Sequence, residues 1–233
     1  MNVLVIAAHP DDEVLGCGGT VAALAARGHA VAIGILGEGI TSRFEQRQQA
    51  DAASIAELHG HSHKAAALLG ARELRLAGLP DNRFDTVALL DVVKIIEQWI
   101  REFAPGRVYT QHGGDLNIDH GVTFRATLTA TRPLAGGVVK ELYAYPVASS
   151  TEWAFGRFAP AFRANVFVDV AATLEQKVAA MAVYESEARP FPHPRAAESL
   201  RAAAAHWGAA AGLAAAEPFE LVRAIDDGQG KNG

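Results

Sequence analysis

The sequence predicts an α/β fold, Rossmann-like, with a mainly parallel sheet and helices on both faces. Residues 3–8 and 30–36 are apolar runs rich in Val and Ile, and an alanine-rich helical stretch lies between them at residues 16–27. A strand, a helix and a second strand in this order form a βαβ unit. The alternation of helix and strand continues beyond this unit, and such repeats favour a parallel sheet covered on its faces.

The following elements keep the alternation. Helices are predicted at residues 46–69, 87–103 and 121–131, and short strands are predicted at residues 73–76 and 107–110. The helix at 87–103 has apolar residues at helical spacing, which are Leu89, Leu90, Val93, Ile96 and Ile100. Gly70 is a suitable C-cap for the helix before it.

The pattern is weaker after Gly137. Strands are predicted at residues 138–145 and 165–170, and helices at residues 171–184 and 196–212. No stretch is rich enough in Pro, Gly or Ser to mark a linker, so we expect one domain over residues 1–233. The polar, glycine-containing tail at residues 226–233 is expected to be frayed.

Composition narrows the class of protein. The net charge is −5 and no basic stripe is present, which excludes nucleic acid as an expected partner. Cys17 is the single cysteine, so an intramolecular disulfide and a Cys-based zinc knuckle are both excluded, and a reducing cytoplasmic location is expected. No run approaches the ~20 apolar residues of a membrane span. Two interpretations of the segment with Trp153 and Phe155 remain, namely that it forms a lid or that it forms a contact within a homo-oligomer.

Chemistry-bearing residues follow the first predicted strand. In open parallel sheets, ligands bind beyond the carboxyl ends of the strands, and His9, Asp11 and Asp12 lie there. His9 and Asp12 are close enough in sequence to reach one point from a tight turn. Because a catalytic zinc has three protein ligands and an open position, these two side chains are candidate ligands. Asp11 would then be free for another task.

A second polar cluster follows the strand at residues 107–110. It contains His112, Asp115, Asn117, Asp119 and His120. His120 can complete a His-Asp-His set, and Asp119 can orient a ligand or accept a proton from it. An Asp pair before a helix is also a common N-cap, and a histidine at a strand end is often a hydrogen-bonded surface residue. The residues alone leave both interpretations open.

The segment at residues 8–20, AHPDDEVLGCGGT, resembles the signature of the PIG-L/LmbE-type deacetylases. These are zinc enzymes that remove acyl groups from substrates containing N-acetylglucosamine. The segment from Tyr109 to His120 is similar to the second family motif, and residues 79–84, 193–195 and 208–219 carry weaker likenesses. The resemblance covers most of the chain and implies the LmbE-like form of the Rossmann-like fold.

The resemblance also implies roles for individual residues. His9, Asp12 and His120 would hold Zn²⁺, although sites of this composition also accept Fe²⁺ or another divalent ion. Asp11 would be the general base. The implied substrate is a small N-acetylated amino sugar or its conjugate. A zinc amidase for a non-sugar metabolite, such as a thiol conjugate or an acylated antibiotic, is one alternative, and a non-catalytic sugar-binding module is another.

The sequence departs from the family pattern near the second motif. Many members carry a histidine, thought to stabilise the oxyanion, where this chain has Asn117, which can donate a hydrogen bond but cannot carry charge. Two alternatives stay open, namely that Asn117 does a reduced version of this job or that another residue replaces it, for which His193 is our candidate. Gln111 and Gly121 stand where a histidine and an arginine are common. The side chains expected to contact substrate are those of Arg43, Arg47, His112 and Asp115.

Overall fold

The computed structural model describes residues 1–43, 49, 51–226 and 228. Within them, seven strands form one sheet in the order β3-β2-β1-β4-β5-β7-β6. The strands are β1 (Asn2–Ala7), β2 (Ala30–Gly37), β3 (Glu73–Leu79), β4 (Arg107–Gln111), β5 (Glu141–Tyr145), β6 (Val166–Asp169) and β7 (Ala216–Ala224). β1 to β5 are parallel, whereas β7 runs antiparallel to both β5 and β6.

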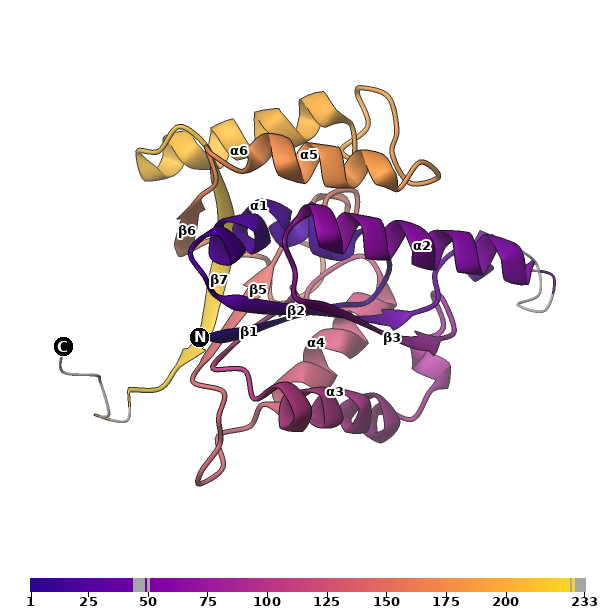
Figure 1. Cartoon of the computed structure of the whole chain (residues 1–233), viewed down its shortest axis with the longest axis vertical. Helices are drawn as coiled ribbons and strands as arrows, with labels where there is room; N and C mark the ends of the chain where they lie inside the picture. Colours follow the sequence, from indigo (N-terminus) through magenta and orange to yellow (C-terminus); the bar gives the residue numbers. More distant parts are fainter. Residues whose placement is uncertain (44–48, 50, 227, 229–233) are drawn as a thin grey trace.

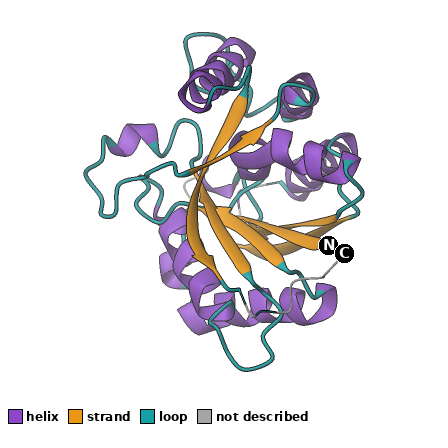
Figure 2. Ribbon diagram, turned by 90° about the vertical axis from the view of Figure 1, so that its left-hand side faces the viewer, coloured by secondary structure: helices purple, strands orange, loops and turns teal. Residues whose placement is uncertain are grey.

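Helices cover both faces of this sheet (Figures 1 and 2). One face carries α1 (Asp12–Ala26) and α2 (Ala52–Leu68), and the other carries α3 (Leu89–Phe103) and α4 (Ile118–Ala130). α5 (Leu174–Val183) and α6 (Ala197–Ala211) form a further layer above α1 and α2 in Figure 1. Short 3-10 turns are η1 (Thr41–Arg43), η3 (Phe84–Thr86) and η4 (Glu152–Ala154). The predicted fold class, a mainly parallel sheet between helices, is confirmed.

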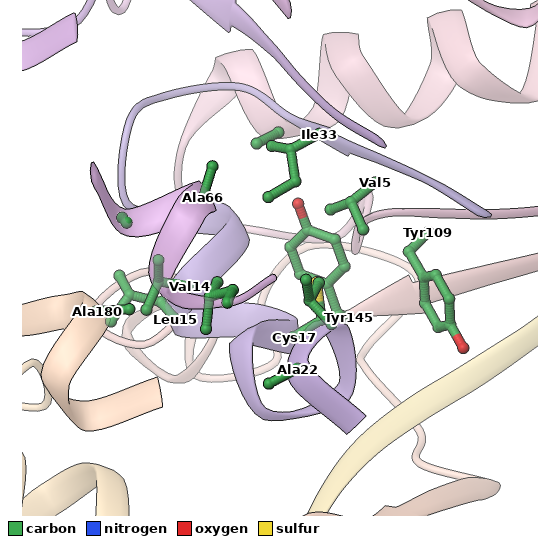
Figure 3. Close-up of a cluster of buried hydrophobic side chains, with 14 of the residues drawn as sticks. Val5, Val14, Leu15, Cys17, Ala22, Ile33, Ala66, Tyr109, Tyr145 and Ala180 are labelled. Carbon is green, nitrogen blue, oxygen red and sulfur yellow. The ribbon is translucent and has the colours of Figure 1, made fainter. Parts of the chain in front are cut away.

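The core on the α1 side is built around Tyr145 (Figure 3). Its ring is fully buried, and its hydroxyl donates a hydrogen bond to the carbonyl oxygen of Ile6 at 2.8 Å. A Cβ at position 16 would overlap this ring. Gly16 therefore lets the first turns of α1 lie directly on the sheet, which fixes the turn that connects β1 to α1.

The core on the other face is packed by α3. Val93 and Ile96 are buried there, as their helical spacing predicts, together with Trp99. Leu90 is 62% exposed, so its place in the predicted apolar stripe was wrong. The buried residues of α3 are Val92, Val93, Ile96, Trp99 and Phe103, and at helical spacing Leu90 falls outside the stripe that they form.

Strand β7 was missed by the sequence analysis. It contains Pro218, which has no N–H to donate, and its apolar residues do not alternate with polar ones. Its buried Glu217 accepts hydrogen bonds from the backbone N–H groups of Gly19 and Thr20, and lies 2.6 Å from Lys177 Nζ. Long-range pairing of this kind leaves no local pattern.

Two predicted helices differ from the structure at their starts. α1 begins at Asp12 and α4 at Ile118, several residues earlier than predicted. α4 begins early because the Asn117 side chain accepts a hydrogen bond from the backbone N–H of Asp119. The start of the helix predicted at 46–69 and most of the tail at 226–233 lie outside the described residues. No helix in the described ranges is both long and apolar enough to cross a membrane.

Candidate metal centre

The two polar clusters meet at one edge of the sheet. Residues 8–11 connect β1 to α1, and His120 lies in the first turn of α4, just after β4. β1 and β4 are neighbours at the point where the order of strands along the chain reverses. Ligands of open α/β sheets bind at this kind of switch point, beyond the carboxyl ends of the strands.

Three predicted ligands converge there. Asp12 Oδ2 lies 3.4 Å from His9 Nδ1 and 3.2 Å from His120 Nε2. One ligand atom from each residue lies within 4.8 Å of the other two. Asp12 and His120 are each 2% exposed. A single cation can therefore contact all three side chains without a change in the backbone.

Each imidazole has a second carboxylate behind it. His9 Nε2 is hydrogen-bonded to Asp119 Oδ2 at 2.9 Å, and His120 Nδ1 lies 3.3 Å from Asp115 Oδ1. A carboxylate at this position favours the tautomer whose N–H points toward it, so the opposite nitrogen keeps its lone pair for a metal. The donor set fits a divalent cation such as Zn²⁺.

A second group of potential ligands shares His9. Its members are His9, Asp81 and Asp119, whose ligand atoms also lie within 4.8 Å of one another. Asp81 Oδ2 accepts hydrogen bonds from the backbone N–H and the hydroxyl of Ser42, and Asp119 Oδ1 accepts one from the N–H of Phe84. Because these carboxylates already hold η1 and η3, and the group has one imidazole, we favour the set with His120.

Opposite charges in the cluster stabilise one another and shift the pKa values of its side chains. Burial alone would raise the pKa of Asp12, but His120 and His9 hold that pKa well below its usual range. Burial lowers the pKa of His120, yet the carboxylates of Asp12 and Asp115 outweigh it and raise the pKa to about 9. The site thus attracts positive charge, which either protons on the imidazoles or a bound cation can supply.

Asp11 lies beside this cluster in a constrained turn. Its φ is 100°, a conformation that residues other than glycine rarely adopt. Its N–H donates to Glu13 Oε2 at 3.1 Å, and Glu13 Oε1 accepts a hydrogen bond from the Tyr184 hydroxyl at 2.6 Å. Glu13 therefore holds the turn in place. Burial raises the pKa of the Asp11 carboxyl well above its usual range, although the charge of Arg195 opposes this.

Arg195 is the residue that the sequence analysis missed. Its Nη1 donates to Asp11 Oδ2 at 2.8 Å and to Glu187 Oε2 at 2.9 Å, while its Nε donates to Ser149 Oγ at 2.8 Å. The likeness at residues 193–195 marked this segment, but no spacing rule links it to an aspartate near the N-terminus. Only the folded chain brings the two together.

His193 lies outside this arrangement. Its Nδ1 accepts a hydrogen bond from the backbone N–H of Arg195, and its ring packs edge-on against Trp153. The structure gives it a contact that shapes the loop, not one with the metal ligands. Trp153, in contrast, lines the pocket beside them.

The remaining residues that the sequence pointed to have different contacts in the structure. Asn117 caps α4 and donates from Nδ2 to Asn82 Oδ1 at 2.8 Å, while Gln111 donates to Asp12 Oδ2 at 2.9 Å. Asp115 accepts hydrogen bonds from the hydroxyls of Ser150 and Thr151, and His112 is bonded to the carbonyl oxygen of Pro160.

His112 and Asp115 are therefore buried supports and not, as predicted, side chains in the pocket at the metal ligands. Asp115 stands behind His120, and His112 ties the chain near Gly114 to residue 160. Arg47 and the side chain of Arg43 lie outside the described residues.

A pocket of about 570 Å³ opens over the ligands. Its lining includes four carboxylates, from Asp11, Asp12, Asp81 and Glu187. Arg195 is the one lysine or arginine that lines it within the described part of the chain. The pocket has the size of a small-molecule site and a polar floor with a few directed groups.

Comparison with known proteins places the chain among deacetylases. It is 30% identical over 138 residues to an uncharacterized deacetylase, YaiS, of Escherichia coli K12, a match that covers 57% of this chain and 69% of that protein. It is 26% identical over 192 residues to a probable N-acetyl-α-D-glucosaminyl L-malate deacetylase 2 of Bacillus cereus, with 80% and 83% covered.

Solved structures share the fold at lower identity. The N,N'-diacetylchitobiose deacetylase of Pyrococcus horikoshii superimposes with a TM-score of 0.75 at 20% identity, over 95% of this chain and 84% of that one. The 4-carboxy-2-hydroxymuconate hydratase GalB of Pseudomonas putida KT2440 superimposes with a TM-score of 0.72, also at 20% identity, over 97% and 98%. The fold by itself therefore does not select a reaction.

Sequence similarity decides the family. The model of the PIG-L family, described as GlcNAc-PI de-N-acetylase, matches residues 4–131, a range that contains His9, Asp11, Asp12 and His120. This range is more than half of the chain and spans both motifs on which the resemblance was based. The chain belongs to the PIG-L (LmbE-like) deacetylase family.

Proposed function

We propose that the protein is a metal-dependent N-deacetylase that hydrolyses the N-acetyl amide of an N-acetylglucosamine-type substrate or its conjugate. The observation that carries the proposal is the convergence of His9, Asp12 and His120 on one point, with Asp11 beside them. The names of the deacetylase relatives support an acetylated sugar over a non-sugar amide.

The metal ligands would hold a divalent cation, zinc in our proposal. When bound, such a cation supplies Lewis acidity and makes water a better nucleophile at neutral pH. Asp119 and Asp115 keep the two imidazoles oriented toward it. Gln111, which donates to the Asp12 oxygen nearest both imidazoles, fixes that carboxylate.

Asp11 would move the proton. Its carboxylate takes a proton from the water that attacks the acetyl carbonyl, and delivers it to the departing amine nitrogen. The products are acetate and the free amino sugar. Arg195 holds Asp11 Oδ2, which leaves Oδ1 without a hydrogen-bond partner among the described residues and available for the proton.

Arg195 would also supply the positive charge that Asn117 lacks. Asn117 Nδ2 is already bonded to Asn82, so it is a poor donor for a developing oxyanion. Arg195 Nη2, in contrast, makes no hydrogen bond within the described ranges, and the side chain lines the pocket. A cation directed at developing negative charge stabilises the transition state of amide hydrolysis.

Acetate release from methyl N-acetyl-β-glucosaminide, with and without added zinc, tests the proposal. We expect release that a chelator abolishes and zinc restores, and that Asp11→Asn removes. Asp91→Asn, an exposed aspartate on α3, is the matched control and should keep full activity. Unchanged release in Asp11→Asn contradicts the role of Asp11. A protein that binds the sugar, holds no stoichiometric metal and releases no acetate is a binding module instead.

A further inference from the structure

The turn between β1 and α1 is followed by a buried acid that the proposed reaction does not use. Glu13 is 1% exposed and lies in the first turn of α1. Its Oε2 accepts a hydrogen bond from the backbone N–H of Asp11 at 3.1 Å, and its Oε1 accepts one from the hydroxyl of Tyr184 at 2.6 Å. A buried carboxylate is costly unless its oxygens are hydrogen-bonded, and here both oxygens are. Glu13 therefore joins the backbone of Asp11 to a distant part of the chain.

The backbone of Asp11 adopts a conformation that needs such support. Its φ is 100° and its ψ is −28°, a region that residues other than glycine occupy only where the surrounding structure enforces it. The carbonyl oxygen of Asp11 accepts hydrogen bonds from the N–H groups of Val14 and Leu15, at 3.0 and 2.9 Å. On the other side of the residue, its N–H is held by Glu13. Loss of Glu13 would release that side and let the Asp11 side chain change direction with its backbone.

The neighbouring aspartate is held by different contacts. Asp12 Oδ2 accepts a hydrogen bond from the backbone N–H of His9 at 2.8 Å and another from Gln111 Nε2 at 2.9 Å. Neither contact involves Glu13. A change in the Glu13 side chain should therefore displace Asp11 while the candidate metal ligands keep their places.

Tyr184 fixes the Glu13 carboxylate from the end of α5. It is fully buried, and its carbonyl oxygen accepts a hydrogen bond from the N–H of Glu187 at 2.8 Å. The carboxylate of Glu187 in turn contacts Arg195, which donates to Asp11 Oδ2. The segment after α5 thus holds Asp11 at two points, its backbone through Glu13 and its carboxylate through Arg195.

We propose that Glu13, anchored by Tyr184, is a positioning residue that fixes the direction of the Asp11 carboxylate. Glu13 is not part of the pocket lining, so it acts through Asp11 and not on the substrate. The inference rests on the proposed function, because it assumes that Asp11 moves the proton. A misplacement of about 1 Å at a reacting group can lower the rate about a hundredfold, which is why the turn has to be held rigidly.

Glu13→Ala and Tyr184→Phe, each loaded with zinc, test the inference by steady-state kinetics of acetate release from methyl N-acetyl-β-glucosaminide. We expect Glu13→Ala to lower kcat about ten- to hundredfold, because the Asp11 N–H loses a charged acceptor. Tyr184→Phe should lower kcat about two- to tenfold, because Glu13 keeps its bond to Asp11 and loses only its anchor. KM should stay close to the wild-type value in both variants.

Two further variants serve as controls. Glu13→Gln should recover most of the rate, because its amide oxygen still accepts the Asp11 N–H. Tyr109→Phe should keep full activity, because this second buried tyrosine places its hydroxyl beside Arg107 and away from the pocket. Circular dichroism melting confirms that each variant is folded.

Two readouts do not depend on turnover. Titration calorimetry should give Glu13→Ala the zinc affinity of the wild type, because the contacts of Asp12 and His9 remain. Crystals of Glu13→Ala should show Asp11 with a φ outside the left-handed region and its carboxylate turned, whereas crystals of Glu13→Gln should show the wild-type turn.

The outcomes separate this inference from the proposed function. Wild-type kcat in folded Glu13→Ala or Tyr184→Phe overturns the inference, and so does a loss of rate that comes with a loss of zinc or that Glu13→Gln does not recover. An Asp11 that keeps its conformation in Glu13→Ala crystals overturns it as well. If Glu13→Ala does not fold, Tyr184→Phe decides. A wild-type protein that releases no acetate, or normal release in Asp11→Asn, contradicts the reaction instead, and the crystals still show whether Glu13 places Asp11.

Discussion

Replacement of Arg195 should lower catalysis while leaving substrate binding largely intact. The guanidinium is 2.8 Å from Asp11 Oδ2 and also holds Glu187 and Ser149. A hydrogen bond to a charged group contributes about 1.5–3 kcal/mol, which corresponds to about a ten- to hundredfold change in rate if it acts in the transition state. We expect Arg195→Met to reduce kcat by about this factor with a small change in KM.

The control for this prediction lies on the same loop. Arg189 is exposed and, among the residues that the structure describes, donates only to the backbone oxygens of Ser186 and Ala188, so Arg189→Met should keep full activity. Arg195→Lys should recover part of the rate, because a lysine keeps the charge but cannot hold several acceptors at once. Steady-state kinetics of acetate release measures all three. A normal kcat in Arg195→Met would refute the placement of Arg195 beside the reacting groups.

Three further outcomes follow from the packing and charges. Gly16→Ala should lower the free energy of unfolding by about 1–3 kcal/mol, because the added methyl group overpacks the core. Gly60→Ala, in open space on α2, should instead raise the free energy of unfolding by up to about 1 kcal/mol. Urea melts in which the two variants have the same stability would contradict these predictions. Lys177→Met should lower the free energy of unfolding by about 3 kcal/mol, because it removes the ammonium group that pairs with the buried carboxylate of Glu217. A urea melt that does not differ from that of the wild type would contradict this prediction. Burial lowers the pKa values of His9 and His120, but the neighbouring carboxylates outweigh it, and they raise the pKa of His9 well above its usual range and that of His120 to about 9. Because a metal must displace a proton from each imidazole, the apparent zinc affinity should fall by more than about tenfold per pH unit from pH 8 to 7, and an affinity independent of pH would contradict this.

The candidate metal ligands could be predicted because they follow a local rule. His9 and Asp12 come directly after β1, and His120 follows β4. β4 lies next to β1 in the sheet. A parallel sheet brings such strand ends together whatever the details of the loops. The requirement for glycine at position 16 follows no such rule, because the Tyr145 ring that it accommodates is distant in sequence.

The rest of the site depends on contacts that no spacing encodes. Asp11 meets Arg195 across almost the whole chain, and β7 pairs with β5 and β6, which come from earlier parts of the sequence. Asp119 was expected to orient one of the metal-binding side chains. In the structure it contacts His9, and not His120, which follows it in the sequence. His193 was the candidate that sequence offered in place of the missing histidine, whereas the folded loop directs Arg195 to the pocket.

The proposed reaction depends above all on the identity of the three metal ligands. Crystals grown with stoichiometric zinc, with data collected on both sides of the zinc absorption edge, test it most directly. We expect one strong anomalous peak in contact with His9, Asp12 and His120, and its loss in His120→Ala. A peak held by His9, Asp81 and Asp119 instead, or no peak at either place, would contradict it.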